Sequence, residues 1–298
     1  MALCCAAWWA IGSHASHLLI AVAVCGALAV AALFQATLLR KHWRIAAQLA
    51  LIIALSVGAQ IAINTVLYGK PSLEGEPPPF LTARLIVDGP GRWYLEKNCS
   101  QSAWEVCRYQ NNLSGSSDRF LWKPDGVWAN ASLSSQKLIR TQDKAFAKAV
   151  WRAYPREELL LCATNFVRQL MLFKIDGFAL SHDVAVQMHA TLPQAEGKYL
   201  ESRQARNQLP IGLFNFIHYG AVIASLAGIA ILLPWFRRTR PRQLIALSFV
   251  IAVCIVANAL CTATLSTVDG RYESRVIWLV PFFALLCAFT QHAAKADE

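Results

Sequence analysis

The chain has 298 residues, of which 56% are hydrophobic and only 15% charged, and its formal net charge is +10. Four charge-free stretches of about 20 residues or more make a water-soluble core a poor explanation for so apolar a chain. The polar middle, 68–210, holds 18 basic and 14 acidic residues. Most of the net positive charge therefore lies outside the middle. The nearly balanced charge of the middle gives no reason to expect binding to nucleic acid.

The amino-terminal segment, MALCCAAWWAIG, is apolar but too short to cross a bilayer, which takes about 20 residues. It has neither the basic n-region nor the small-residue exit of a signal peptide, so we expect no cleavage. An external amino terminus without a translocated leader would be natural in the carboxy-terminal part of a longer polytopic ancestor. That origin is our expectation for this chain.

Two apolar runs before the middle, 18–39 and 45–67, and two after it, 213–236 and 244–268, contain no Asp, Glu, Lys or Arg. At ~1.5 Å per residue, each can cross a hydrocarbon layer of ~30 Å, so all four predict transmembrane helices. A shorter fifth run covers 276–290. Because ionisable groups inside a membrane usually mark ion or proton paths, the uncharged spans make a transporter the third choice of function.

The basic residues outside the middle are concentrated in the two short loops that join these spans. Such loops stay cytoplasmic because moving Lys and Arg across the membrane is costly, so the middle and the loop 269–275 should face the other side. We expect anionic lipid heads, not nucleic acid, beside them. The loops hold no acid and these basic residues: Arg40, Lys41, Arg44, Arg237, Arg238, Arg240 and Arg242.

The middle begins with a proline-rich linker and then predicts a mainly helical domain. Residues 80–87 predict a short helix or strand, and the turn residues DGPG and a second short amphipathic piece follow. Ser134 or Ser135 can cap a helix that continues to about residue 154.

Pro155 begins the next predicted helix, 156–174, and a third covers 181–192. In the first of these, apolar residues recur at near-helical spacing. Cys162 lies on this apolar helix face, and we expect it to be buried and free. The residues that define the face are Leu160, Phe166, Val167, Leu170 and Met171.

Six of the nine cysteines lie in apolar segments, where they act most simply as small hydrophobic residues. Cys99 and Cys107 lie in the middle, eight residues apart. If that side of the membrane is oxidising, these two are candidate disulfide partners.

A cluster of His182, Asp183 and His189 has the residue types of a metal or acid–base site. A spacing of seven places both histidines on one helical face, but they are too far apart to share an ion without further ligands. Solvated surface residues are the preferred interpretation. No nucleotide-binding, hydrolase or zinc-protease motif occurs, so we predict no metal and no cofactor, and no catalytic residue is identifiable.

The loop 269–275, DGRYESR, is the most suggestive segment. Its Arg271, Tyr272 and Arg275 are candidate ligand-binding residues, because they lie where a lipid head group or a lipid-linked phosphate would be. The alternative is that the loop anchors the chain at the interface and that its charges pair with one another.

Three segments resemble an uncharacterised family of polytopic inner-membrane proteins of proteobacteria: PPFLTARLIVDGPGRWYL (78–95), FLWKPDGVW (120–128) and GRYESRVIWLVP (270–281). The resemblance covers about half of the chain and implies a location, but no activity. The last segment is also similar to the R-Y-x-x-P ending of polyprenyl-phosphate-sugar glycosyltransferases with many membrane helices. Those enzymes place a catalytic acid in their first outer loop, and the comparable amino-terminal region is missing here.

Together these features predict an all-α integral membrane protein of the bacterial inner membrane with about five transmembrane helices. Its parts are an amino-terminal membrane region (1–67), a periplasmic helical domain (68–210) and a carboxy-terminal membrane region (211–298). We expect a binding or assembly component at the periplasmic face, in cell-envelope biogenesis. Its expected partners are the lipid bilayer, a lipid-linked phosphate or sugar, and another membrane protein. A membrane glycosyltransferase, or the remnant of one, is the alternative.

Overall fold

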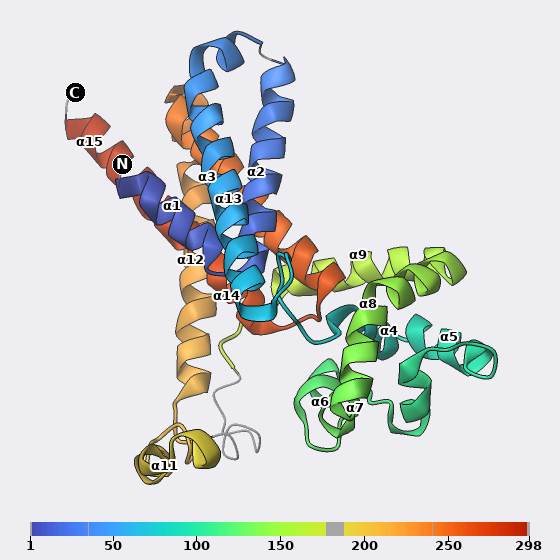
Figure 1. The fold of residues 1–298 in the computed structure, drawn as a ribbon. Helices are drawn as coiled ribbons and strands as arrows, with labels where there is room; N and C mark the ends of the chain where they lie inside the picture. Colours follow the sequence, from blue (N-terminus) through green and yellow to red (C-terminus); the bar gives the residue numbers. More distant parts are fainter. Residues whose placement is uncertain (1, 35, 177–187, 240, 297–298) are drawn as a thin grey trace.

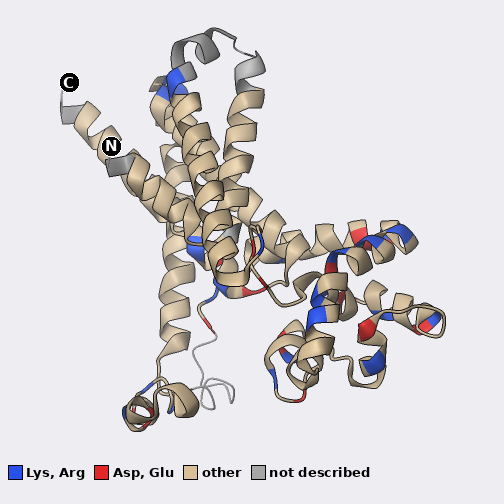
Figure 2. Cartoon of the chain, viewed as in Figure 1, with Lys and Arg blue, Asp and Glu red and all other residues tan. Residues whose placement is uncertain are grey.

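The computed structural model describes residues 2–34, 36–176, 188–239 and 241–296, and every regular element in these ranges is a helix (Figure 1). No strand occurs in the described ranges, in agreement with the predicted all-α class. The helices form a long bundle and a polar domain that extends to one side of it (Figure 1). Charged side chains are sparse along the bundle and frequent on the polar domain (Figure 2).

The bundle contains most of the apolar sequence. Four of its segments are long and apolar enough to cross a membrane, which indicates a membrane-embedded protein: Arg44–Tyr68, Ile211–Thr239, Arg242–Leu265 and Gly270–Ala294. Within the first predicted span, 18–39, the apolar stretch found among the described residues is shorter, Ser16–Val30. The bundle helices are α1 (Ala2–Gly12), α2 (Ala15–Phe34), α3 (Ala36–Tyr68), α12 (Ile211–Thr239), α13 (Arg242–Leu265), α14 (Gly270–Ile277) and α15 (Leu279–Ala296).

Two segments that we predicted as loops are helical. The basic segment 40–44 lies within α3, because its residues are mostly good helix formers and neither Gly nor Pro interrupts Ala36 to Arg44. The segment 269–275 forms the start of α14. Here the carboxylate of Asp269 caps the helix by accepting a hydrogen bond from the backbone N–H of Arg271, at 3.0 Å.

The polar domain has one continuous apolar core. Leu85 and Leu95 from its first two helices pack with Phe120, Phe146 and Val150, all of which are fully buried. The residues 80–87 are helical, not extended. Its helices are α4 (Phe80–Asp88), α5 (Pro90–Asn98), η1 (Glu105–Asn112), α6 (Ser117–Trp122), α7 (Val127–Asn130), α8 (Leu133–Ala153) and α9 (Pro155–Met171).

Two details of this domain refine the sequence analysis. The cap of α8 is Ser132, whose hydroxyl accepts a hydrogen bond from the N–H of Ser135, and neither Ser134 nor Ser135 has that role. Cys99 and Cys107 are joined by a disulfide bond, which links the end of α5 to η1.

Helix α9 buries its polar side. Glu158, Cys162, Asn165 and Gln169 recur every three or four residues and are all buried. Cys162 is buried and free, as expected, but it lies among polar residues. The apolar face that we predicted around it is instead exposed over Leu160, Val167 and Met171, because hydrophobic periodicity identifies two helix faces without telling which one is covered.

A buried arginine explains the polar side of α9. The guanidinium of Arg84 on α4 donates to Glu158 and to Asp88, both at 2.9 Å, and lies 3.3 Å from the sulfur of Cys162. Asn165 in turn donates to Asp88 at 3.0 Å. Buried charges are stable only when they are paired and hydrogen-bonded, so this network fixes α9 to the domain by its polar face.

The chain leaves α9 along the membrane helices. The side-chain amide of Asn215 on α12 accepts a hydrogen bond from the N–H of Ile175 and donates to its carbonyl oxygen, the latter at 2.9 Å. The ring of Phe173 stacks on Tyr219 with centroids 4.0 Å apart. The remaining described helix, α11 (Pro193–Leu200), precedes α12. The predicted helix 181–192 falls largely outside the described residues.

Candidate functional site

A cavity of about 210 Å³ lies where the polar domain meets the bundle. Its walls come from the α1–α2 connection, from α4 and α6 of the polar domain, and from the α13–α14 connection with α14. The three residues that we predicted as ligand-binding all line it. The lining residues are His14, Phe80, Ser117, Asp118, Leu121, Trp122, Ser266, Thr267, Asp269, Arg271, Tyr272 and Arg275.

The two arginines share one face of α14, because residues four apart lie one turn from each other. Tyr272 lies between them in sequence, and both guanidinium groups approach its ring, with centroid distances of 5.3 Å for Arg271 and 5.4 Å for Arg275. The Tyr272 hydroxyl lies 3.1 Å from that of Ser266. The ring therefore holds two cations close together by cation–π attraction, at a position fixed by its hydroxyl.

The two arginines differ in their partners. Arg271 forms an ion pair with Asp269, at 3.3 Å between Nε and Oδ2. Arg275 has its guanidinium 3.2 Å from Nε2 of His14, and no carboxylate within the described ranges pairs with it. Asp269 and Asp118, which also lines the cavity, equal the two arginines in number. The case for an anion therefore rests on Arg275, whose guanidinium is not paired to a carboxylate of the described residues.

His14 adds little charge at neutral pH. Partial burial, together with the positive charge of Arg275 and the nearby His17, lowers the pKa of His14 below its ordinary value of 6.5. The imidazole is therefore neutral at pH 7, and it lines the cavity as a polar group.

A side-chain amide from the polar domain fixes the turn that carries the arginines. Gln169 of α9 is fully buried, and it donates to the carbonyl oxygen of Asp269 and accepts from its N–H, each at 2.9 Å. Asp269 then caps α14. The backbone at Gly270 approaches Lys174 so closely that a Cβ would lie 2.6 Å from the Lys174 carbonyl oxygen, so only glycine fits there.

A second amide supports α14 from within the bundle. Asn258 of α13 donates to the carbonyl oxygen of Tyr272 at 3.0 Å and to the carboxylate of Glu273 at 2.9 Å. Glu273 is fully buried, and its other oxygen, Oε1, has no hydrogen-bond partner among the described residues. The arginine-bearing helix is thus held both by the polar domain and by α13.

The opposite wall supplies an acid and aromatic rings. Asp118 lies in the first turn of α6, with its carboxylate 3.6 Å from Lys123. Trp122 on the same helix packs near Phe80, with ring centroids 6.3 Å apart. Sequence reasoning missed His14, Asp118 and Trp122 as site residues. The one available signal was that Trp122 falls in the quoted FLWKPDGVW segment.

The remaining candidates from the sequence do not form a site in the described ranges. His189 lies 2.8 Å from the carboxylate of Glu196, and His182 and Asp183 lie outside the described residues. No group of three possible metal ligands occurs in the part of the chain that the structure describes.

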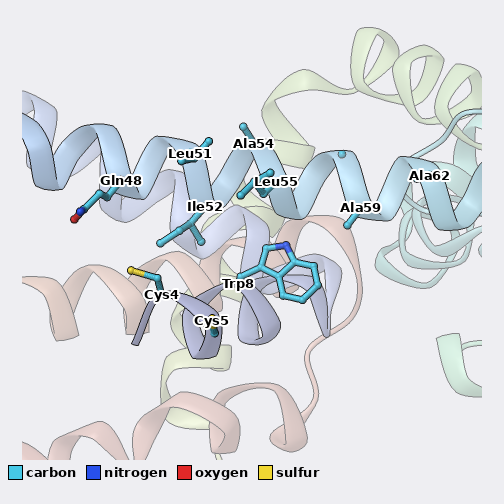
Figure 3. Close-up of a pocket in the computed structure, with 11 residues that line it drawn as sticks. Cys4, Cys5, Trp8, Gln48, Leu51, Ile52, Ala54, Leu55, Ala59 and Ala62 are labelled. Carbon is cyan, nitrogen blue, oxygen red and sulfur yellow. The ribbon is translucent and has the colours of Figure 1, made fainter. Parts of the chain in front are cut away.

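A second, larger hollow of about 710 Å³ lies between α1 and α3. Figure 3 shows α1 alongside α3, with Ile52 of α3 extending toward the side of α1 that carries Cys4 and Trp8. Its lining is apolar except for the amide of Gln48 and the thiols of Cys4 and Cys5, so it lacks the charged groups that line the smaller cavity.

Comparisons with protein-family models, with curated proteins and with solved structures found no match for this chain. The resemblances described above therefore rest on the quoted segments alone.

Proposed function

We propose that this protein is a non-enzymatic binding component of the bacterial inner membrane that holds the phosphate of a lipid head group between Arg271 and Arg275. The observation that carries the proposal is the convergence of both arginines on one cavity, with no carboxylate among the described residues paired to Arg275. Guanidinium groups match phosphate oxygens in geometry and charge. The cavity lies at the end of the membrane helices, where lipid phosphates are found.

The proposed orientation places the polar domain in the periplasm. Arg237, Arg238 and Arg242 lie where α12 ends and α13 begins, at the opposite end of these helices from the α13–α14 connection. Short basic connections are retained in the cytoplasm during insertion. In this proposal α2 crosses the membrane as well, which makes five spans. The role in cell-envelope biogenesis follows from a periplasmic site for a phosphate-bearing lipid, and another membrane protein is the expected partner in assembly.

Binding to the purified protein in neutral detergent tests the proposal. A polyprenyl phosphate should bind, and the matching polyprenol, which lacks the phosphate, should not. The substitutions R271A and R275A should each raise Kd about tenfold or more, because each removes a charge-assisted hydrogen bond. The control R108A alters an exposed arginine of η1 and should leave Kd unchanged.

Two results would contradict the proposal in different ways. Unchanged Kd values for both R271A and R275A would exclude the arginine pair as the phosphate site. Equal affinity for inorganic phosphate and for polyprenyl phosphate would show that the ligand is not a lipid.

A membrane glycosyltransferase that uses a lipid-linked sugar is the second candidate. One observation favours it: Asp118 lines the same cavity as the arginines, on the polar-domain side, so an acid is available near the phosphate site. D118N separates the two functions. If the protein is an enzyme, D118N should abolish sugar transfer but leave polyprenyl phosphate binding intact. If it is a binding protein, neither the original protein nor D118N should transfer sugar. A binding protein should instead lose co-purifying partners when its polar domain is altered.

A further inference from the structure

We propose that α9 lies in the membrane interface, with its exposed apolar side among the lipids of the bilayer that the bundle crosses. The polar domain would then rest on the membrane through a helix parallel to its surface. This inference concerns a surface away from the arginine pocket, and it does not depend on which ligand the pocket holds.

The exposed side of α9 is mostly apolar, and between Leu159 and Met171 its exposed polar residues are Thr164 and Arg168. Leu160, Val167 and Met171 lie on one side of the helix at helical spacing, and they are 69%, 58% and 71% exposed. From Leu159 to Met171 the only charged exposed residue is Arg168. In water such a surface would be unfavourable by about 25 cal/mol for each Å² of apolar area, and contiguous apolar surface of this kind marks a contact with lipid or protein.

Because α9 buries its polar side, it cannot bury its apolar side instead by rotating about its own axis. Turning the helix to bury Leu160 and Val167 would expose Glu158 and separate it from Arg84, leaving a buried guanidinium without its partner. The polar side is therefore committed to the domain. The apolar side remains outward, and the same polar residues prevent α9 from crossing the membrane.

The position of α9 matches the depth of the interface. Its last turn hydrogen-bonds through Gln169 to Asp269, just beyond the end of α13 at Leu265. Figure 1 shows α9 running across the direction of the bundle, with α4 to α8 below it and α2 and α3 rising above it, while α12 extends past it toward α11. Helix α9 also packs against α13. In this proposal the apolar side lies at the level where α13 leaves the bilayer.

Lipid is the occupant that these observations favour over a second protein. Arg156, at the start of α9, and Arg168, near its end, are both exposed. At these positions long cationic side chains can extend toward lipid phosphates while the helix lies among the acyl chains. A second copy of the chain or another membrane protein would have to supply an acid opposite each arginine, whereas a membrane surface presents phosphates wherever the helix lies on it.

Site-specific photocrosslinking in native-lipid nanodiscs tests the inference. A benzophenone amino acid at Leu160, Val167 or Met171 should give adducts that increase the protein mass by one lipid. Leu133 is the matched control, because it is an apolar residue that is 85% exposed at the start of α8 in the same domain, and it should give several times less lipid adduct.

Each alternative occupant has its own product. Adducts at Val167 and Met171 with twice the chain mass would assign the face to a second copy, and adducts with another protein would assign it to that partner. Either product, or lipid labelling no stronger than at Leu133, would overturn the proposal. Unchanged Kd values for R271A and R275A would refute the phosphate site and leave this result unaffected, so the two proposals fail separately.

Discussion

Helices α8 and α9 follow each other in the polar domain and bury opposite kinds of side chain. In α8 the buried residues include Ile139, Phe146 and Val150, and the exposed ones include Lys144. In α9 the buried residues are polar, and Leu160 is exposed. The pair shows that burial follows from what each helix faces: α8 faces the apolar core, whereas α9 faces a buried arginine on one side and, in our proposal, lipid on the other.

The largest expected effect is a loss of stability from truncating the buried apolar face of α8. F146A should lower the free energy of unfolding of the polar domain by about 3–5 kcal/mol, because it leaves a cavity in the core. L160A on α9 should change the value by less than about 0.5 kcal/mol in detergent. Pulse proteolysis measures both variants. Equal losses would mean that α9 is packed against protein by its apolar face.

The polar face of α9 should be nearly as sensitive. R84L removes the partner of Glu158 and leaves that carboxylate buried, so we expect a loss of about 3–5 kcal/mol in the free energy of unfolding. R152L changes an exposed arginine at the end of α8 and serves as the control. Hydrogen exchange should localise the loss to α4 and α9, and an unchanged exchange pattern would contradict the assigned role of Arg84.

Two glutamines with the same kind of hydrogen bonding allow stability to be separated from binding. Gln142 of α8 accepts from the N–H of Glu105 at 2.8 Å and donates to the carbonyl oxygen of Ala103 at 2.9 Å, much as Gln169 does with Asp269. Q169L and Q142L should each cost about 1–3 kcal/mol, because backbone groups lose their partners.

Only Q169L should also weaken polyprenyl phosphate binding, since of these two glutamines only Gln169 contacts the turn that carries Arg271. The comparison uses Kd values measured on folded protein at a temperature below both transitions. Equal Kd values for the two variants would show that Gln169 has only a structural role.

The smallest effect concerns pH. Burial raises the pKa of Glu158 above its ordinary value of 4.5, and it raises the pKa of Asp88 in the same way, while Arg84 opposes both shifts. A carboxyl whose pKa is higher in the folded state stabilises that state fully below its unfolded pKa and loses this contribution as pH rises through the folded pKa.

Domain stability should therefore fall as pH rises from about 4.5 toward neutrality, by less than the loss from Q169L. E158Q should reduce the slope, because the amide does not titrate. The measurement is the denaturation midpoint of both proteins across this range. A slope that is the same in E158Q would exclude Glu158 as a source of the pH dependence.

The sequence predicted the parts of this molecule that local spacing determines. Arg271 and Arg275, four residues apart, could be expected to act together, and the short separation of Cys99 and Cys107 permitted the bond that the structure contains. His14 could not be foreseen, because 261 residues separate it from Arg275 and only the packing of the bundle brings them together.

The orientation of α9 was wrong in the sequence analysis for a related reason. Its apolar and polar residues recur with the helical period, and this pattern defines the two faces of the helix without indicating which face is buried. Which side is covered depended on Arg84, a residue of another helix whose burial no local signal indicated. The prediction of a loop at 269–275 was wrong because we overlooked Asp269 as a helix cap.

The side-chain amide of Asn215, which pairs in both directions with Ile175, has a consequence for a chain that has been cut. Together with Gln169, it attaches the carboxyl end of the polar domain to two separate membrane helices, α12 and α14, without a covalent bond. Cleavage in the connection 201–210, between α11 and α12, would therefore leave the two fragments associated, because these hydrogen bonds join residues on opposite sides of the cut. A nicked protein should migrate as a single particle in mild detergent and separate only when it is denatured.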